Sequence, residues 1–185
     1  YAIFINFSIF YLVLFVTLWQ IFSTSIINIT NFMDGIDGLV ATSIAIIILS
    51  WSFLYSTDFI YLFPSLLAFL FWNWHPSKLF MGDVGSTYLG GILCCLFLKS
   101  PNIEACLSIL LISSPLWIDA LTCIYRRVIS NQNIFYPHKL HLYQRLVQGG
   151  MSHSKVTLLY ASCSFALFLL FNIIGFRYFF IIILI

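Results

Sequence analysis

Four polar side chains stand at every third position in a region that is otherwise apolar, and they are Asn28, Asn31, Asp34 and Asp37. On an α-helix, residues three positions apart are neighbours, so the four groups would form one slanting stripe. Carboxylates and carboxamides suit a hard cation or the donor edge of a nucleotide base. The alternative is a capped loop, in which the Asp-Gly pairs of "MDGIDGL" form turns or end the helix.

A second motif, "KLFMGDVGSTYLGG", places Asp83 among glycines at the start of an apolar segment. Backbone N–H groups at the start of a helix attract phosphate. Mg²⁺ commonly binds one or two carboxylates together with substrate phosphates. This motif therefore predicts a metal–phosphate site, with a plain helix-start aspartate favoured by the helix dipole as the alternative.

A third motif, "YPHKLHLYQRL", gathers the cationic or protonatable residues His138, Lys139, His141 and Arg145. Such a patch suits a pyrophosphate or the phosphate of a lipid. Two alternatives are a zinc site, for which only two nearby ligands are visible, and a basic loop that touches anionic lipid headgroups. The remaining histidines, His75 and His153, are interpreted as residues of the membrane interface.

The composition indicates what must position these groups. Hydrophobic residues make up 62% of the chain, charged residues 8%, and the mean hydropathy is +1.03, whereas soluble domains carry about 25% charged residues. We therefore expect an all-α, polytopic membrane helical bundle that forms one integral-membrane domain over residues 1–185. A net charge of +2 is too small to suggest a nucleic-acid partner. The five cysteines lie in apolar runs without a CxxC pair, which favours packing roles over disulfides or zinc.

Six to seven membrane spans are predicted from the apolar segments. They lie at about 3–27, 40–56, 59–74, 86–98, 105–125 and 156–173, with a further stretch at 176–185. If the spans alternate, the connections 28–39, 74–87 and 126–155 share one side and hold six of the eight Lys and Arg residues. The excess of basic residues places that side in the cytoplasm. A transporter would instead place ionisable residues within its spans, where only Asp119 is a candidate.

The three motifs, in this order, resemble those of the polyprenyl-phosphate N-acetylhexosamine-1-phosphate transferases of glycosyltransferase family 4. This family includes the MraY-type and WecA-type enzymes, and the resemblance covers about residues 20–160. It implies an enzyme of the bacterial inner membrane that uses Mg²⁺, with Mn²⁺ as an alternative. The enzyme would move a sugar-1-phosphate from a UDP-N-acetylhexosamine to polyprenyl (undecaprenyl) phosphate at the cytoplasmic face and release UMP.

Within the family, "HLYQRL" followed by "GMSH" is most similar to the subgroup that initiates O-antigen (lipopolysaccharide) or capsule units rather than the peptidoglycan branch of cell-wall biogenesis. The motifs do not distinguish between sugar donors, and a homodimer is one of the oligomeric states that the sequence allows.

The resemblance also implies a role for each matching residue. The expected metal ligands are Asp83 and Asn31. The expected catalytic residues are Asp34, Asp37, His138 and His141. The expected substrate-binding residues are Asn28, Asn31, Asp37, Lys139 and Arg145, with Asp37 facing the uridine.

One departure from the family pattern is clear. Family members carry an aspartate-rich motif in their N-terminal half and have about ten or eleven spans, whereas no acidic residue precedes Asp34 here. The chain is therefore expected to be the C-terminal part of a larger transferase and to be incomplete by itself. The alternatives are a catalytically incomplete remnant or scaffold that keeps the fold and, less favoured, an unrelated transporter.

Overall fold

A computed structural model describes residues 2–133, 136 and 140–184, and this part of the chain is all helical apart from its connections. The predicted all-α fold is thereby confirmed. Eight α-helices and one short 3-10 helix follow one another in the order α1 (Ala2–Phe32), α2 (Leu39–Leu54), η1 (Thr57–Phe59), α3 (Leu62–Asn73), α4 (Gly82–Leu98), α5 (Ile103–Ile112), α6 (Ser114–Ile129), α7 (Leu142–Gln148) and α8 (His153–Leu184).

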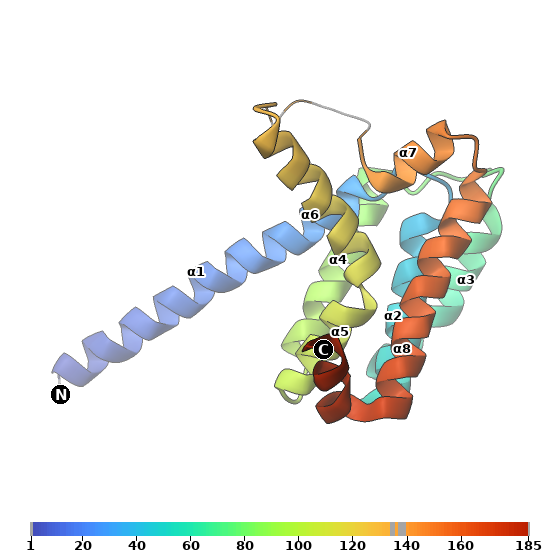
Figure 1. Cartoon of the computed structure of the whole chain (residues 1–185). Helices are drawn as coiled ribbons and strands as arrows, with labels where there is room; N and C mark the ends of the chain where they lie inside the picture. The colour runs from blue at the N-terminus through green and yellow to red at the C-terminus, as the bar shows by residue number, and fades with distance from the viewer. Residues whose placement is uncertain (1, 134–135, 137–139, 185) are drawn as a thin grey trace.

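The hydrophobic core lies between α2 and the helices around it. α2 packs against α3 and α8, and α4 packs along the C-terminal part of α1. Ile44, Ile48 and Leu96 are fully buried, because these helices carry apolar residues on nearly every face. The N-terminal part of α1 extends away from the bundle, as Figure 1 shows, and its apolar side chains from Ile9 onward are exposed.

A close approach between α1 and α4 occurs at Gly90. A Cβ atom at this position would lie 2.8 Å from the Cα of Ile27, which is closer than packed carbon atoms can sit. Glycine therefore lets the two backbones touch one turn before the polar end of α1.

Two helices are long and apolar enough to cross a membrane, and their qualifying segments are Ile9–Phe32 and His153–Ile173. The pair α5 and α6 counts as a third if the two form one bent span. α2, α3 and α4 are apolar but shorter. The described residues therefore form a partial membrane helical bundle, and the full count of six to seven spans stays a prediction.

The structure differs from the predicted spans in two places. The span expected at 105–125 is broken between α5 and α6, which meet at a bend of 69°. Pro115 explains the break, since it has no N–H to donate and its ring clashes with the preceding turn of a continuous helix. The segment 176–185 was expected to be separate, but α8 continues through this region to Leu184 because no strong helix breaker interrupts the apolar sequence.

Three connections meet at one end of the bundle, at the top of Figure 1: the α1–α2 loop, the α3–α4 loop and the segment that contains α7. These are the connections that the sequence placed on a common side. The helical stripe expected from Asn28 to Asp37 is wrong in its second half, because α1 ends at Phe32 and leaves Asp34 and Asp37 in the loop. The turn-forming glycines of "MDGIDGL" account for that end.

Candidate active site

Asn31, in the last turn of α1, joins the first motif to the second. Its Nδ2 donates to Asp83 Oδ1 at 3.2 Å and to Ser86 Oγ at 2.9 Å. Asp83 is exposed in the first turn of α4, while Ser86 is buried one turn later. Two residues 52 positions apart thus lie side by side, held there by the close packing of α1 on α4.

Asp34 adds a second carboxylate to this corner. Burial, together with the negative charge of Asp83, raises the pKa of Asp34 from its ordinary 3.8 to about 6. Two carboxylates that repel each other next to a carboxamide and a hydroxyl form a set of hard oxygen donors, which is the set that Mg²⁺ and Mn²⁺ prefer. The residues Asn31, Asp34 and Asp83 therefore fit a divalent cation.

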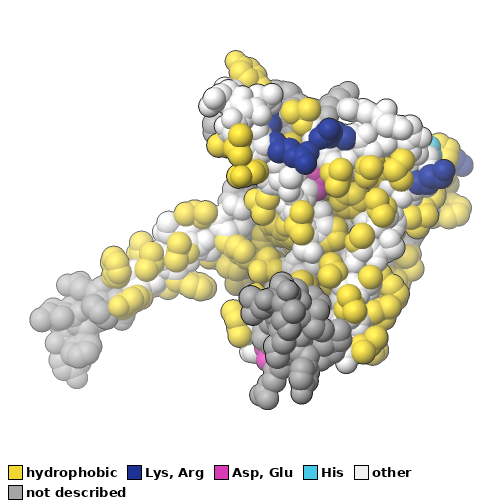
Figure 2. Space-filling model, in the orientation of Figure 1, with side chains coloured by type: hydrophobic (Ala, Val, Ile, Leu, Met, Phe, Trp, Pro, Cys, Tyr) yellow, Lys and Arg dark blue, Asp and Glu magenta, His cyan; other side chains and the backbone are white. Residues whose placement is uncertain are grey.

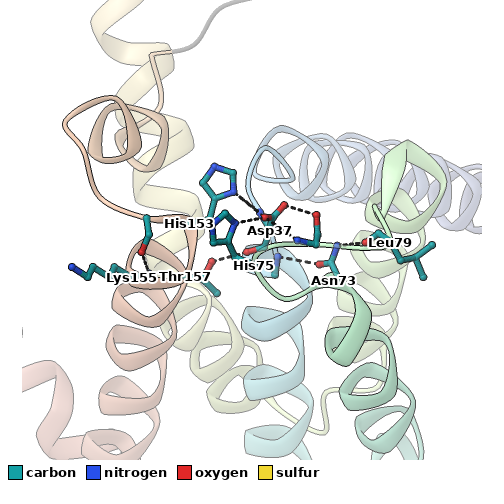
Figure 3. A network of polar contacts seen from close by, with 10 residues as sticks. Asp37, Asn73, His75, Leu79, His153, Lys155 and Thr157 are labelled. Carbon is teal, nitrogen blue, oxygen red and sulfur yellow. Dashed lines mark hydrogen bonds and ion pairs between the residues drawn. The ribbon is translucent and has the colours of Figure 1, made fainter.

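Asp37 is the centre of a separate cluster, shown in Figure 3. Its Oδ2 lies 2.6 Å from His75 Nδ1 and 3.1 Å from His153 Nδ1, and its Oδ1 accepts a hydrogen bond from Ser77 Oγ at 2.8 Å. Burial tends to raise the pKa of Asp37, but the hydrogen bonds from His75, Ser77 and His153 outweigh it and hold this pKa below its usual value. Asp37 is therefore a carboxylate at neutral pH.

The backbone around Asp37 is fixed as well. The N–H of Gly38 donates to Asn73 Oδ1 at 3.0 Å, and Asn73 Nδ2 donates to the carbonyl of Leu79 at 2.8 Å. Thr157, in the first turns of α8, donates to the carbonyl of Asp37 at 2.9 Å. The loop that carries Asp37 is thus tied both to the α3–α4 connection and to α8 (Figure 3).

Asp119 of α6 holds the start of α7. Its carboxylate accepts the backbone N–H groups of Leu142 at 2.7 Å and Tyr143 at 3.1 Å, and the hydroxyl of Tyr160 at 2.6 Å. His141 is buried beside it, with Nδ1 at 3.5 Å from Asp119 Oδ1. The buried carboxylate thereby orients His141 and has its own lone pairs satisfied.

Tyr143 connects this arrangement with the loop after α1. Its hydroxyl donates to the carbonyl of Phe32 at 3.0 Å. A Cβ atom at Gly35 would lie 2.1 Å from the hydroxyl oxygen of Tyr143. A side chain at position 35 would therefore collide with the buried Tyr143, which explains the glycine here. The start of α7, including His141, consequently lies against the loop that holds Asp34.

An apolar groove of about 290 Å³ runs between α6 and α8. Ile118, Leu142 and Leu159 contribute to its walls. Arg126, at its edge, also lines a neighbouring hollow of about 120 Å³ together with Arg127 and Arg145. Figure 2 shows Lys and Arg side chains gathered at this end of a surface that is otherwise largely hydrophobic.

A family model for glycosyl transferase family 4 matches residues 2–100 of the chain, which is more than half of its length. The chain belongs to glycosyl transferase family 4. The family resemblance that the motifs suggested is thereby confirmed, and the match covers the first two motifs, including Asn31, Asp34, Asp37 and Asp83.

Curated relatives of this family 4 chain are named for two kinds of transferred group. A probable undecaprenyl-phosphate N-acetylglucosaminyl 1-phosphate transferase of Bacillus subtilis is 36% identical over 141 residues, which are 69% of this chain and 39% of the relative. A decaprenyl-phosphate N-acetylglucosaminephosphotransferase of Mycobacterium leprae is 34% identical, over 74% of this chain and 42% of the relative. A phospho-N-acetylmuramoyl-pentapeptide-transferase of Endomicrobium trichonymphae is 33% identical, over 83% and 47% respectively. The chain thus spans less than half the length of each of these relatives.

The structure of this family 4 chain brings some of the expected site residues together and leaves others apart. Asn31 and Asp83 are hydrogen-bonded, and the charge of Asp83 reaches Asp34. Asp37 lies in the separate cluster with His75 and His153, and His141 lies beside Asp119 at the start of α7. Asn28 is exposed on α1 one turn earlier, and Arg145 is exposed on α7. His138 and Lys139 lie outside the described residues, as does the two-histidine zinc alternative that needs His138. The roles of all these residues stay predictions.

Sequence reasoning missed the surroundings of Asp37. His75 and His153 were interpreted as interfacial residues, but both contact the Asp37 carboxylate. They are 38 and 116 positions away from Asp37 along the chain, so no local pattern connects them. The one available signal was that all three residues fall in connections predicted to share one side of the membrane.

Proposed function

We propose that this chain is the part of a polyprenyl-phosphate sugar-1-phosphate transferase that binds a divalent cation and a UDP-sugar at the cytoplasmic face of the bacterial inner membrane. The observation that carries the proposal is the hydrogen bond between Asn31 and Asp83, which joins the first two motifs at one end of an apolar helical bundle, with Asp34 and Asp37 in the loop that follows Asn31. Charged groups are scarce in this chain, so their gathering at one membrane face supports a site for a charged, water-soluble substrate.

The reaction is a displacement at phosphorus. An oxygen of the lipid phosphate attacks the β-phosphorus of the UDP-sugar, the bond from that phosphorus to the bridging oxygen breaks, and UMP leaves with the electron pair. The acceptor phosphate is already an anion at neutral pH, so no side chain has to remove a proton before the attack. Mg²⁺, when bound by Asp83 and Asn31, would supply positive charge for the pyrophosphate and the leaving UMP.

The side chains around the cation centre divide the remaining tasks. The carboxylate of Asp37, fixed by His75 and Ser77, can accept the N–H of a uracil ring. His141, oriented by Asp119, and Arg145 can stabilise phosphate charge. His138 and Lys139 are proposed for the same task from the sequence alone, and Asn28 for substrate binding.

The groove between α6 and α8 supports a lipid as the acceptor. Its apolar walls suit an isoprenoid chain, and Arg126 and Arg145 at its polar end suit a phosphate. Arg127 is less suited, because its guanidinium already donates to the carbonyls of Asn133 and Tyr136.

The sugar is proposed to be of the N-acetylhexosamine type, with N-acetylglucosamine as the first candidate, because two of the relatives are named for its transfer. Initiation of O-antigen or capsule synthesis is proposed from the "HLYQRL…GMSH" pattern alone. The names of the relatives do not separate the two branches, since they include both an N-acetylglucosaminyl 1-phosphate transferase and a phospho-N-acetylmuramoyl-pentapeptide-transferase.

The test is a transfer assay on membranes that contain the protein in its natural full-length form. A panel of UDP-N-acetylhexosamines is incubated with undecaprenyl phosphate, and both the lipid product and the release of UMP are scored. We expect one donor to give a lipid-linked sugar pyrophosphate in the presence of Mg²⁺ and none after chelation. Correctly inserted protein that gives no product with any donor would support the remnant alternative instead.

A further inference from the structure

Asp37, His75 and His153 form a cluster of three metal-ligating side chains that is separate from the corner formed by Asn31, Asp34 and Asp83. One possible ligand atom from each of the three side chains lies within 4.8 Å of the others. The two imidazole rings are tilted by 48° with centroids 4.8 Å apart, and Figure 3 shows both rings directed at the same carboxylate. The side chains of His75 and His153 are 37% and 31% exposed, so an ion from solution can reach them.

Asp37 Oδ2 is the atom on which both rings converge. His75 Nδ1 lies 2.6 Å from it and His153 Nδ1 lies 3.1 Å from it. Metal ions bind histidine nitrogens that have lost their proton, so an ion at this point would replace the ring protons that these contacts hold.

We propose that Asp37, His75 and His153 bind one Zn²⁺ ion, with a fourth position open to water or another small ligand. Zn²⁺ takes histidine nitrogens and carboxylate oxygens at about 2.0–2.2 Å in tetrahedral sites, which places neighbouring ligand atoms about 3.3 Å apart. The 3.1 Å contact with His153 is close to that value, and the 2.6 Å contact with His75 has to open slightly. Imidazole ligands favour Zn²⁺ over Mg²⁺, so this ion differs from the one that suits Asp83.

Zinc at this position would join three segments of the fold. Asp37 belongs to the α1–α2 loop, His75 to the α3–α4 loop, and His153 is the first residue of α8. Binding to the folded state alone would therefore stabilise the fold, by an amount that grows with the logarithm of the zinc concentration once this exceeds the dissociation constant. The inference does not depend on the transfer reaction.

The test uses the full-length protein, purified in detergent and dialysed against a chelator. Cys95 and Cys163 are replaced by serine, because exposed thiols also bind zinc. Zn²⁺ titrated by calorimetry should bind once per chain, and the melting temperature should rise with added Zn²⁺. His75→Gln and His153→Gln should each weaken binding by roughly 100-fold, because even residues behind a metal ligand contribute 10–100-fold.

Two comparisons make the result decisive. Glutamine keeps a hydrogen-bonding group, so equal melting temperatures without zinc would show that the variants fold like the parent. Asp58→Asn is the control, because it removes an exposed carboxylate in η1, away from the cluster, and it should bind Zn²⁺ as tightly as the parent. Unchanged binding in His75→Gln and His153→Gln, equally weakened binding in Asp58→Asn, or no saturable binding by the parent would each overturn the proposal.

Discussion

The negative charge of Asp83 acts on Asp34, and without a cation this repulsion destabilises the folded state when both groups are ionised. Burial and the charge of Asp83 keep the pKa of Asp34 near 6, so Asp34 holds a proton more tightly in the folded state than in the unfolded state. A group of this kind favours the folded state at low pH, and its contribution is lost as the pH rises through the folded pKa.

This linkage predicts an inverted pH dependence for the metal-free protein. Between about pH 4 and pH 7 its melting temperature should fall, corresponding to at most about 3 kcal/mol of unfolding free energy. Mg²⁺ or Mn²⁺ should raise the melting temperature again above pH 6, because a bound cation takes the place of the proton on Asp34. Differential scanning fluorimetry of the parent and of Asp34→Asn measures the melting temperature across this pH range. The part of the fall that is due to Asp34 should be missing in the variant. An equally steep fall in Asp34→Asn would contradict the assignment to Asp34.

At the level of single residues, the sequence predicted the members of the site better than their neighbours. Asn31 and Asp83 were expected together at a metal, and they are hydrogen-bonded. The partners of Asp37 were not predicted, since hydrogen bonds over such chain separations follow from helix packing rather than from spacing. Local sequence patterns could likewise not predict that Asp119 is buried beneath α7 and accepts its first N–H groups.

Among the helices, the contact of α1 with α4 sets the geometry of the site. Asn31 is in the last turn of α1 and Asp83 in the first turn of α4, so any separation of the two helices moves these residues apart. Gly90 lies about two turns further along α4 than Asp83, where the two backbones touch.

The neighbouring glycines of α4 provide a matched pair of substitutions. Gly90→Ala should destabilise the protein by about 1–3 kcal/mol through overpacking against Ile27, and should weaken Mn²⁺ binding as α1 shifts. Gly91→Ala should be neutral or stabilising by up to about 1 kcal/mol, since nothing lies within 4 Å of its new Cβ and alanine favours helix. Melting temperature and Mn²⁺ affinity are the measurements. Equal effects of the two substitutions would show that α1 and α4 are not packed so closely.

Most helices could be predicted from apolar length, but their ends depended on individual residues. The bend at Pro115 interrupts a segment whose hydrophobicity gives no sign of a break, and α1 ends at Phe32, several residues beyond the span predicted to end at about residue 27. Both features serve the site, because α6 carries Asp119 towards α7 and the loop after Phe32 frees Asp34 and Asp37 from the helical stripe.

In the whole molecule, the polar groups gather at one end of an apolar bundle, and the sequence predicted this from the distribution of Lys and Arg. The hydrogen bonds between the α1–α2 loop, the α3–α4 loop and α7 show that these connections share one end. Asp58 lies in the short helix η1, just after the end of α2 that is farthest from these connections. It can therefore serve as a marker for the opposite side of the bundle.

The orientation predicted from the distribution of Lys and Arg can be tested by labelling. In a cysteine-free background, Lys78→Cys and Gln148→Cys should react with a membrane-impermeant maleimide only from the cytoplasmic side, because both positions are exposed in the polar connections. Asp58→Cys should react only from the other side. Labelling of all three positions from the same side would contradict the proposed topology.

The central claim is that one divalent cation binds where Asn31, Asp34 and Asp83 meet, and Mn²⁺ titration followed by electron paramagnetic resonance tests it most directly. The full-length protein should bind one Mn²⁺ per chain at this site. Asp83→Asn should weaken this binding by roughly 100-fold or more, while Asp58→Asn, which removes an equal charge far from the site, should leave it unchanged. Binding in Asp83→Asn that equals binding in Asp58→Asn would contradict the account.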